Sequence, residues 1–262
     1  MYNFKTKPYD HQQVALDKSW DRPWYGLFME MGTGKTKVAI DTMGMLFLAG
    51  EIKAALIIAP KGVFGNWLHK EIPQHMSEDV KTDCLLWQPN TTQKFQKRLI
   101  QVARGSGDAL RILIMNVEAL STKKGTSVAN DFLKLNPDSF VAVDESTTIK
   151  NRQAQRTKNI IKLGKQAKYK RILTGSPITK NPMDLFSQCA FLNSSILGFD
   201  SYYAFQGRYA VVTQRKFGAR SFQQITGYRN LEELNCKIEK HSHRVLKEDC
   251  LDLPDKIYMQ RQ

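Results

Sequence analysis

Residues 29–36, Met-Glu-Met-Gly-Thr-Gly-Lys-Thr, have the residue types needed to hold a nucleoside triphosphate. Gly32 and Gly34 let the backbone wrap closely, so that amide N–H groups and a helix N-terminus can point at the β- and γ-phosphates. Lys35 supplies a positive charge to those phosphates, and the hydroxyl of Thr36 can ligate Mg²⁺. The segment predicts a phosphate loop that binds ATP and Mg²⁺ through Gly32, Thr33, Gly34, Lys35 and Thr36.

This loop departs from the general pattern GxxxxGK[ST] at one position. The pattern has a glycine five residues before Gly34, where this sequence has Met29. A chance Gly-x-Gly-Lys-Thr at a strand–helix turn is the alternative interpretation. The position of the segment favours the phosphate loop, because it follows the apolar run Tyr25–Phe28 and precedes the helix-compatible segment Lys35–Leu48.

A pair of carboxylates provides a second chemical signal. The apolar run Phe140–Val143 leads directly into Asp144 and Glu145. A carboxylate at the carboxyl end of a buried strand next to a phosphate loop holds Mg²⁺, directly or through water. A neighbouring carboxylate can accept a proton from the attacking water or orient it. We assign Asp144 to the metal and Glu145 to the water, and count Lys35 with them as catalytic. The alternative, an Asp-Glu pair that opens a surface loop, would be preferred only for an isolated pair.

The elements that must position these residues follow from a recurring order of short apolar runs and polar, helix-compatible segments. The runs are continuous rather than alternating, which is typical of strands covered on both faces. The expected strands are Tyr25–Phe28, Ala54–Ala59, Cys84–Trp87, Ile112–Met115, Phe140–Val143 and Arg171–Leu173. The expected crossover helices are Lys35–Leu48, Val63–Ile72, Thr91–Ala103 and Asn151–Leu163. This order predicts an α/β fold with a mostly parallel sheet, and ligands bind at the carboxyl edge of such sheets.

The pattern changes beyond Pro182. Leu185–Leu192 and Asn230–Lys240 indicate helices, whereas Phe199–Tyr228 is aromatic and basic without a strong period. About 80 residues with few aliphatic runs make a thin core for an independent domain. We therefore interpret 182–250 as a helical extension on a single lobe that spans 1–262.

Charge indicates the kind of partner. The 39 Lys and Arg residues against 25 acidic residues give a net charge of +14. A polyanion such as nucleic acid is the natural partner, although a basic protein without one is the alternative. No apolar run is long enough to span a bilayer, so no membrane partner is expected. Four cysteines without CxxC pairing indicate a reduced intracellular protein, cytoplasmic or nucleoid-associated. His241 and His243 suit a metal pair on a strand, but no further ligands accompany them, so ordinary histidines are preferred.

With both motifs present, the chain resembles the superfamily-two helicase-like ATPases, and within them the Swi/Snf class of double-stranded DNA translocases. The segments that carry the resemblance, in chain order, are His11-Gln12, Met29–Thr36, Ala59-Pro60-Lys61 with Asn66-Trp67 and Glu71, Asn116–Leu120, Asp144-Glu145-Ser146, Leu173–Ile178 with Asn181, His243–Lys247 and Leu253–Lys256. The resemblance implies the three-layer, RecA-like first motor lobe, with an ATP site whose adenine is contacted by Gln12. Gln13 is the alternative register for this contact.

The resemblance also implies DNA contacts at strand ends. In related motors the loops that contain Lys61, Asn116, Thr174 and Gly175 touch the phosphate backbone, and backbone contact suits a motor that must grip any sequence. The form Thr-Gly-Ser-Pro at Thr174–Pro177 favours duplex DNA over the RNA-unwinding branch. Ser146 and Thr147 replace the usual Ala-His of the acidic box, so the coupling between this box and the Thr-Gly-Ser-Pro segment needs other hydrogen bonds.

Nothing in the chain, which stops at Gln262, resembles the second lobe of these motors. That lobe carries an arginine worth roughly 10³–10⁵ in rate in related phosphoryl-transfer enzymes. We therefore expect this chain to bind ATP, to hydrolyse it very slowly, and to need a second RecA-like lobe of the same polypeptide. The alternatives are a strand-separating or RNA-directed helicase, and a nucleotide-switched nucleic-acid-binding module without turnover.

Overall fold

The computed structural model describes residues 2–90, 92–105, 108–178, 181–217 and 220–250. In chain order the elements are α1 (Asp10–Ser19), β1 (Trp24–Met29), α2 (Lys35–Leu48), β2 (Ala54–Ala59), α3 (Phe64–Asn66), the π-helix η1 (Trp67–Glu71), α4 (Ile72–His75), β3 (Thr82–Leu86), α5 (Gln93–Arg104), β4 (Leu110–Asn116), the 3₁₀ helix η2 (Val117–Ser121), α6 (Lys123–Leu135), β5 (Ser139–Asp144), the 3₁₀ helix η3 (Ser146–Ile149), α7 (Gln155–Gly164), β6 (Tyr169–Leu173), the 3₁₀ helix η4 (Pro182–Asp184), α8 (Leu185–Leu192), α9 (Tyr202–Tyr209), β7 (Ala210–Phe217), β8 (Arg220–Tyr228), α10 (Leu231–Glu239) and β9 (Ser242–Val245).

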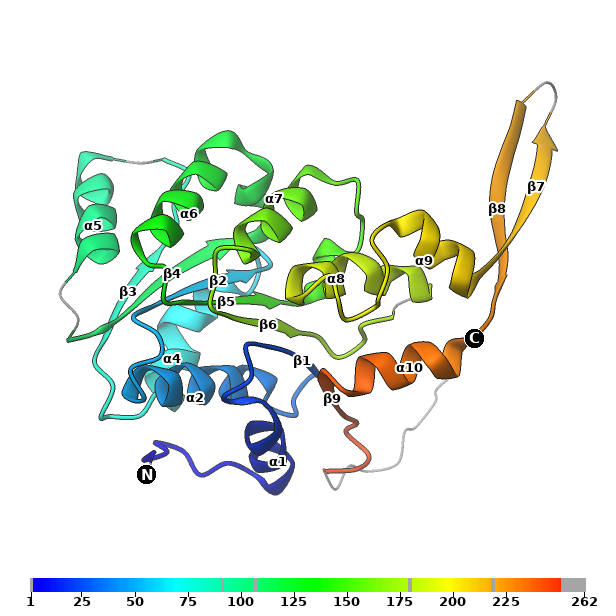
Figure 1. The fold of residues 1–262 in the computed structure, drawn as a ribbon. Coiled ribbons are helices and arrows are strands. Elements are labelled where there is room, and N and C mark those ends of the chain that lie inside the picture. Colours follow the sequence, from blue (N-terminus) through cyan, green and yellow to red (C-terminus); the bar gives the residue numbers. More distant parts are fainter. Residues whose placement is uncertain (1, 91, 106–107, 179–180, 218–219, 251–262) are drawn as a thin grey trace, which may run out of the picture.

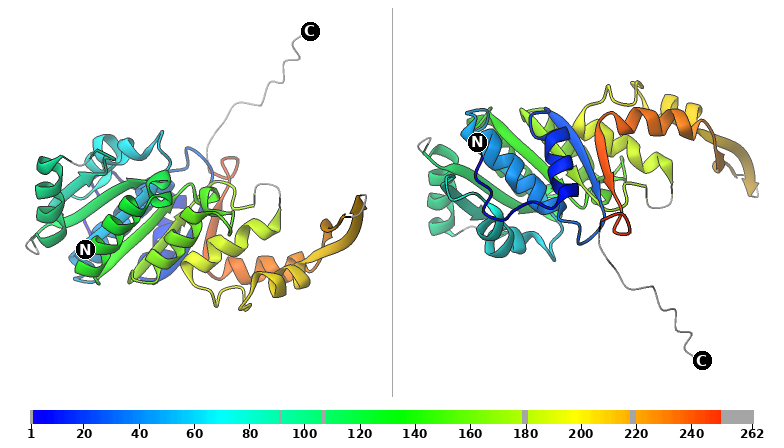
Figure 2. Two further views of the ribbon diagram at one scale, coloured as in Figure 1. Left: turned by 90° about the horizontal axis from the view of Figure 1, so that it is seen from above. Right: turned by 90° about the horizontal axis from the view of Figure 1, so that it is seen from below.

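A twisted sheet forms the middle layer of the molecule (Figures 1 and 2). Among the described residues it has seven strands in the order β3-β4-β2-β5-β6-β1-β9, and every neighbouring pair is parallel. Helices α5, α6, α7 and α8 cover one face, and α1, α2 and α4 cover the other (Figure 1). The predicted three-layer, RecA-like α/β fold is therefore confirmed.

The continuous apolar runs of the sequence are explained by a separate hydrophobic core on each face of the sheet. In β2, Ala54, Leu56 and Ile58 face the α5–α8 layer, whereas Ala55, Ile57 and Ala59 face the α1–α2 layer. Every residue of β2 is buried, because side chains of a strand alternate between faces and both faces here are covered. The same division of β5 between the two cores buries Phe140 with one layer and Val141 with the other.

Three features differ from the sequence prediction. The segment Val63–Ile72 is not one regular helix, because a π-turn at Trp67–Glu71 lies between α3 and α4. The short strand β9 was missed; its sequence Ser-His-Arg-Val lacks an apolar run because only Val245 is fully buried. The segment Phe199–Tyr228 was expected to belong to a helical extension, but it contains the antiparallel pair β7–β8. Thr91, the first residue of one predicted helix, lies outside the described residues.

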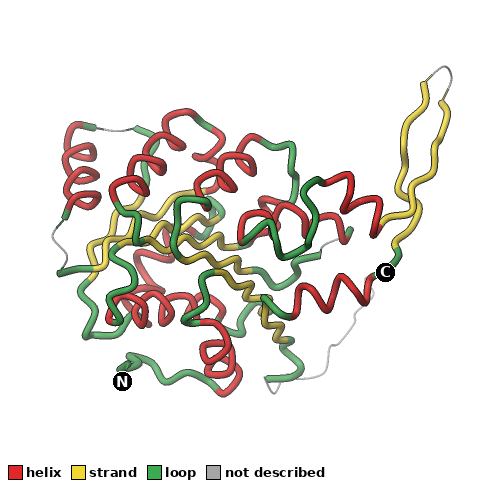
Figure 3. The backbone as a smooth tube through the Cα atoms, in the orientation of Figure 1, coloured by secondary structure: helices red, strands yellow, loops and turns green. Residues whose placement is uncertain are grey.

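Part of the 182–250 segment packs into the core of the α/β body. Phe205 and Tyr209 of α9 are fully buried and belong to the same core as α6, α7 and α8. Figure 3 shows α10 leading from the ribbon back to β9 at the edge of the sheet. Among the described residues, no helix combines the length and apolarity required to cross a bilayer.

Candidate active site

The strand order brings the predicted site residues to one edge of the sheet. Asp144 at the end of β5 lies opposite Leu173 of β6, and Leu173 in turn lies opposite Leu27 of β1. The acidic pair, the segment that begins at Thr174 and the phosphate loop thus leave three adjacent strands in the same direction. Parallel pairing therefore explains why motifs more than 100 residues apart in the chain meet.

The phosphate loop has the backbone that its glycines predict. Gly32 has φ 87° and Gly34 has φ 84°, the left-handed region that glycine enters without steric cost. A β-carbon on Gly34 would lie 2.1 Å from Nε2 of Gln12, so this position also requires the small residue. Thr33 is buried, and its N–H and hydroxyl both bond to the carbonyl of Glu30, at 3.2 and 2.8 Å. The loop then enters α2 at Lys35.

Two segments distant in sequence hold the loop in place. Gln12 of α1 is buried, and its amide donates to the carbonyl of Thr33 at 3.1 Å while it accepts from the N–H of Tyr9. Nε2 of His11 lies 2.8 Å from the same carbonyl of Thr33. On the other side, the carboxylate of Glu30 accepts from the N–H of Lys247, just after β9. Gln12, rather than Gln13, therefore contacts the loop; the predicted adenine contact of Gln12 stays a prediction.

Asp144 is held in a specific orientation by a residue from the π-turn. The indole Nε1 of Trp67 donates to Oδ2 of Asp144 at 3.0 Å, and the N–H of Glu145 donates to Oδ1. Burial raises the pKa of the Asp144 carboxyl, whereas the bond from Trp67 and the charge of Lys35 lower it. The side chain of Trp67 is itself buried. Its hydrogen bond to Asp144 could not be inferred without the π-turn, a feature often found at functional sites.

Glu145 has a strained backbone and a fixed side chain. Its φ of 48° lies in the left-handed region, which is uncommon for residues other than glycine and is often found at functional sites. Its Oε1 accepts hydrogen bonds from the hydroxyls of Thr147 and Thr174, both at 2.8 Å. Two donors from different segments therefore fix the carboxylate.

The bond to Glu145 sets the direction of the Thr174 side chain. Thr174 was expected to contact DNA, but its side chain is fully buried and its hydroxyl is directed to the acidic pair. Gly175 lies directly against the phosphate loop, since a β-carbon there would be 3.2 Å from Cα of Glu30. Thr174 and Gly175 thus line the inside of the site, and the predicted DNA contact of this loop stays a prediction.

The unusual Ser146 also bonds across the site. Its hydroxyl donates to Oε1 of Gln188 in α8 at 2.6 Å, and Nε2 of Gln188 donates to the carbonyls of Pro177 and Asp184. Gln188 is fully buried and had no role in the sequence analysis. Ser146 and Thr147 therefore link the acidic box to the Thr-Gly-Ser-Pro segment by other hydrogen bonds.

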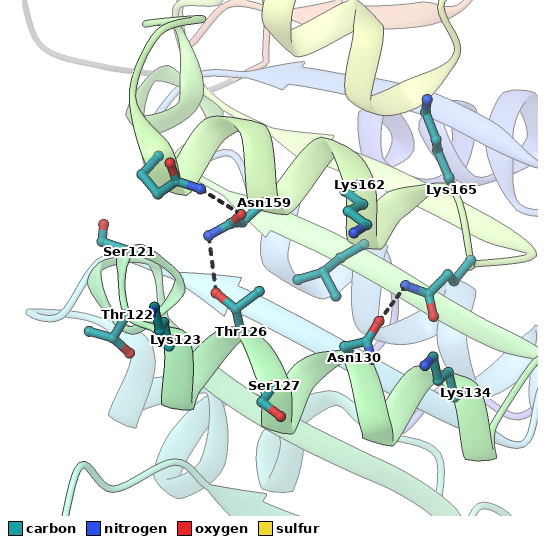
Figure 4. Close-up of a pocket in the computed structure, with 13 residues that line it drawn as sticks. Ser121, Thr122, Lys123, Thr126, Ser127, Asn130, Lys134, Asn159, Lys162 and Lys165 are labelled. Carbon is teal, nitrogen blue, oxygen red and sulfur yellow. Dashed lines mark hydrogen bonds between the residues drawn. The ribbon is translucent and has the colours of Figure 1, made fainter.

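One cavity collects the predicted catalytic side chains. It has a volume of about 350 Å³, and its lining includes Met31, Lys35, Thr36, Asp144 and Glu145. Lysine, hydroxyl and carboxylate groups around one space, at the N-terminus of the 14-residue helix α2, fit the phosphates of a nucleotide with Mg²⁺. A larger cavity of about 1020 Å³ lies elsewhere, between α6 and α7, and contains Lys123, Lys134, Lys162 and Lys165 (Figure 4).

The other residues predicted to contact DNA lie on the neighbouring part of the edge. Ala59 at the end of β2 pairs with Asn116 at the end of β4, so the loop of Lys61 begins beside Asn116. Lys61 is exposed, and Asn116 is half-buried with its amide donating to Glu118 at 3.0 Å. The segment Leu253–Lys256 of the resemblance lies outside the described residues.

The fold and this arrangement of motifs define a RecA-like α/β domain with a phosphate loop at its sheet edge. A family model described as the SNF2-related domain matches residues 23–260. The chain therefore belongs to the SNF2-related domain family, and the predicted Swi/Snf class is confirmed.

Similar proteins are DNA-associated. The chain is 31% identical over 235 residues to the "DNA annealing helicase and endonuclease ZRANB3" of Bos taurus, an alignment that covers 87% of this chain and 20% of that protein. It is 28% identical to a Caenorhabditis elegans "SWI/SNF-related matrix-associated actin-dependent regulator of chromatin subfamily A-like protein 1 homolog", covering 87% and 29%. The chain thus spans less than a third of the length of these relatives.

A solved structure has the same fold. The "Sulfolobus solfataricus SWI2/SNF2 ATPase core in complex with dsDNA" superimposes with a TM-score of 0.68 at 24% identity, covering 94% of this chain and 46% of that chain. At this level of identity the match establishes the fold.

Proposed function

We propose that this chain is the ATP- and Mg²⁺-binding first motor lobe of a DNA-dependent ATPase that translocates on duplex DNA. The observation that carries the proposal is the cavity that Lys35, Thr36, Asp144 and Glu145 line together. Family membership supports ATP hydrolysis as the reaction. A relative named as a DNA annealing helicase and a solved structure in complex with double-stranded DNA support DNA as the polymer on which the protein acts.

In the proposed mechanism the phosphate loop binds the β- and γ-phosphates. Backbone N–H groups around Gly32 and Gly34, with the N-terminus of α2, supply partial positive charge, and Lys35 adds a full charge. Thr36 and Asp144 would hold Mg²⁺, which when bound neutralises charge that develops on the phosphates. Trp67 keeps Oδ2 of Asp144 in a fixed orientation.

Glu145 accepts the proton of the attacking water or orients it. Its Oε1 is fixed by Thr147 and Thr174, so the other oxygen of the carboxylate is left for water. Because Thr174 begins the segment next to the phosphate loop, we propose that it acts as a positioning residue between nucleotide and DNA. Lys61 and Asn116 are proposed to contact DNA phosphates from the loops beside it.

Hydrolysis and movement are proposed to need a second RecA-like lobe, because a charged residue from a second lobe completes the site in related enzymes. The solved ATPase core supports this division, since this chain covers 46% of it. The lobe is proposed to span residues 1–262, with 182–250 as its extension. We propose that the protein acts inside the cell, in the cytoplasm or associated with the nucleoid.

Nucleotide binding by the 262-residue chain tests the proposal. Isothermal titration with ATP and MgCl₂ should give one site, and Lys35→Ala should weaken binding by roughly 10- to 100-fold because a charged hydrogen bond is lost. The matched control Lys158→Ala removes an exposed lysine of α7 and should bind as the unaltered chain does. Equal affinity of the two variants would contradict the assignment of the phosphate loop.

A further inference from the structure

The outer part of the β7–β8 ribbon lies outside the hydrophobic core of the lobe. It projects away from the α/β body in all the views of Figures 1 and 2. Among the described residues it pairs with no third strand. Side chains 211–216 and 221–224 are exposed on both faces of the ribbon. Because an isolated two-stranded hairpin is marginally stable in water, a ribbon of this length indicates a surface that is completed by a partner.

The chemistry of the outer half of the ribbon indicates the partner. Between residues 210 and 230 the sequence contains Arg215, Lys216, Arg220 and Arg229 and no acidic residue. Gln214 lies opposite Gln223, and Lys216 lies opposite Ser221, on one face; Arg215 lies opposite Phe222 on the other. One face therefore presents a lysine together with amide and hydroxyl groups. The other face presents an arginine together with an exposed aromatic ring.

Most apolar side chains described for the ribbon lie near its base, whereas the exposed ring of Phe222 lies farther out, opposite Arg215. Val212 lies opposite Ile225, and Tyr228 opposite Ala210, next to α9. A protein interface would need an apolar centre in the contacting part, whereas the outer half is cationic and rich in hydrogen-bonding groups. This distribution favours a polyanion over a second protein or a second lobe as the partner.

The dimensions fit a duplex groove. Strands of 8 and 9 residues rise about 3.3 Å per residue, giving a ribbon of about 25–30 Å. The major groove of B-form DNA, about 12 Å wide, admits a two-stranded ribbon.

The base of the ribbon is firmly attached to the lobe. Tyr209 is fully buried, and its hydroxyl donates to Glu233 of α10 at 2.8 Å; Arg208 bonds to the same carboxylate. Arg229 donates to the carbonyl of Gly207 across the two chain segments. The guanidinium of Arg152, eight residues after Asp144, lies 4.1 Å from the ring centre of Tyr202 in α9. Helix α9, which leads into the ribbon, thus contacts the segment that follows the acidic box.

We propose that the β7–β8 ribbon is a DNA-contacting arm that enters the major groove of the duplex, with Arg215 and Lys216 bonded to the phosphates that border it. The proposal rests on the proposed action on duplex DNA. The arm would add a DNA contact to those proposed for Lys61 and Asn116 at the edge of the sheet. The contact needs no base-specific bond, which suits a motor that must bind any sequence.

The test is duplex binding by the intact protein, measured by fluorescence anisotropy over a salt series. The variant Arg215→Gln/Lys216→Gln should bind roughly 10- to 100-fold more weakly at about 0.1 M salt, and the slope of log K against log salt should fall by about two, since each phosphate contact contributes about 0.9. The control Lys94→Gln/Lys97→Gln removes the same charge from α5, at the other end of the molecule (Figure 1), and should change neither value. Equal melting temperatures establish that both variants are folded.

A second readout addresses the groove. Methylation of guanine N7, a major-groove atom, should show this contact. The unaltered protein should protect one guanine position that the Arg215→Gln/Lys216→Gln variant leaves open to methylation. Unchanged affinity and salt slope in the arm variant, with duplex binding by the unaltered protein intact, would overturn the arm and leave the proposed function standing. Lack of duplex binding by the unaltered protein would overturn both.

Discussion

The parallel sheet and the β7–β8 ribbon are both made of β-strands, but they differ in what covers their faces. The sheet has a hydrophobic core on each side, and β2, β4 and β5 are almost completely buried. The ribbon is exposed on both sides over most of its length. The two buried faces of the sheet stabilise it and hold the candidate active site in place. The ribbon has no such cover, so its conformation depends on its anchored base and, as we propose, on bound DNA.

The largest expected effect lies at the edge of the sheet. Glu145→Gln should lower the DNA-stimulated ATPase rate of the intact protein by roughly 10²–10⁴, because the amide cannot take a proton from water. ATP affinity should change little, and duplex binding by the ribbon should be unaffected. A rate within a factor of about two of the unaltered protein would mean that another residue activates the water.

The second prediction concerns the stability of the body. Lys37 and Asp41 are both buried and their charged groups lie 2.5 Å apart on α2. Asp41→Ala leaves the ammonium group buried without its partner, which should lower the free energy of unfolding by about 3–5 kcal/mol in urea denaturation. Lys37→Met/Asp41→Leu, which removes both charges, should recover most of this loss. A ribbon variant such as Gln214→Ala should change the global stability by less than about 0.5 kcal/mol.

The same carboxylate gives a pH dependence. Burial raises the pKa of Asp41 from 3.8 to about 6, against the opposing effect of Lys37. Between these values the folded state binds more protons at Asp41 than the unfolded state does. Its contribution to stability therefore decreases as pH rises from about 4 to about 6. The difference in unfolding free energy between the unaltered protein and Asp41→Ala should decrease over the same interval; an increase would contradict the raised pKa.

A smaller effect is expected where the two motifs are coupled. Thr174→Val removes the hydroxyl that donates to Glu145, and DNA-stimulated turnover should fall about tenfold, or about 1.4 kcal/mol, with ATP affinity unchanged. Thr148→Val is the matched control, because Oγ1 of Thr148 is buried and has no hydrogen-bond partner among the described residues. Equal rates for the two variants would remove Thr174 from the mechanism.

The smallest effect should be confined to the ribbon. Hydrogen bonds from Arg208 and Tyr209 lower the pKa of Glu233 to about 2, so the carboxylate stabilises the base above about pH 4.5 and this contribution is lost as pH falls toward 2. At neutral pH, Glu233→Gln should increase amide hydrogen exchange in β7 and β8 and leave the sheet unchanged. Glu232→Gln, one residue earlier on α10, is the control. Faster exchange throughout the sheet would show that the ribbon and the body are one cooperative unit.

The sequence predicted the parts of the molecule in which burial and chemistry follow from local pattern. The six apolar runs are strands, and the phosphate loop and Asp144-Glu145 meet because parallel strands end at one edge. Trp67 could not be assigned to Asp144, because its direction depends on a π-turn in a segment that reads as a regular helix.

Other features depended on tertiary contacts that have no local signal. The loop of Thr174 was expected to contact DNA, and its bond to Glu145, the residue after the neighbouring strand β5, has no local signal in the sequence. Gln188 bonds to Ser146 across 42 residues. The ribbon was missed because strands exposed on both faces have neither a continuous apolar run nor a clear alternation.

The measurement that tests the central claim most directly is the ATPase rate with and without duplex DNA, for the 262-residue chain and for the intact protein. The account predicts ATP binding but very slow hydrolysis by the 262 residues. It predicts turnover by the intact protein that duplex stimulates more than single strands or RNA, and that Lys35→Ala abolishes. Rapid, DNA-independent hydrolysis by the 262-residue chain would show that its site is complete and would contradict the assignment as one lobe of a DNA-dependent motor.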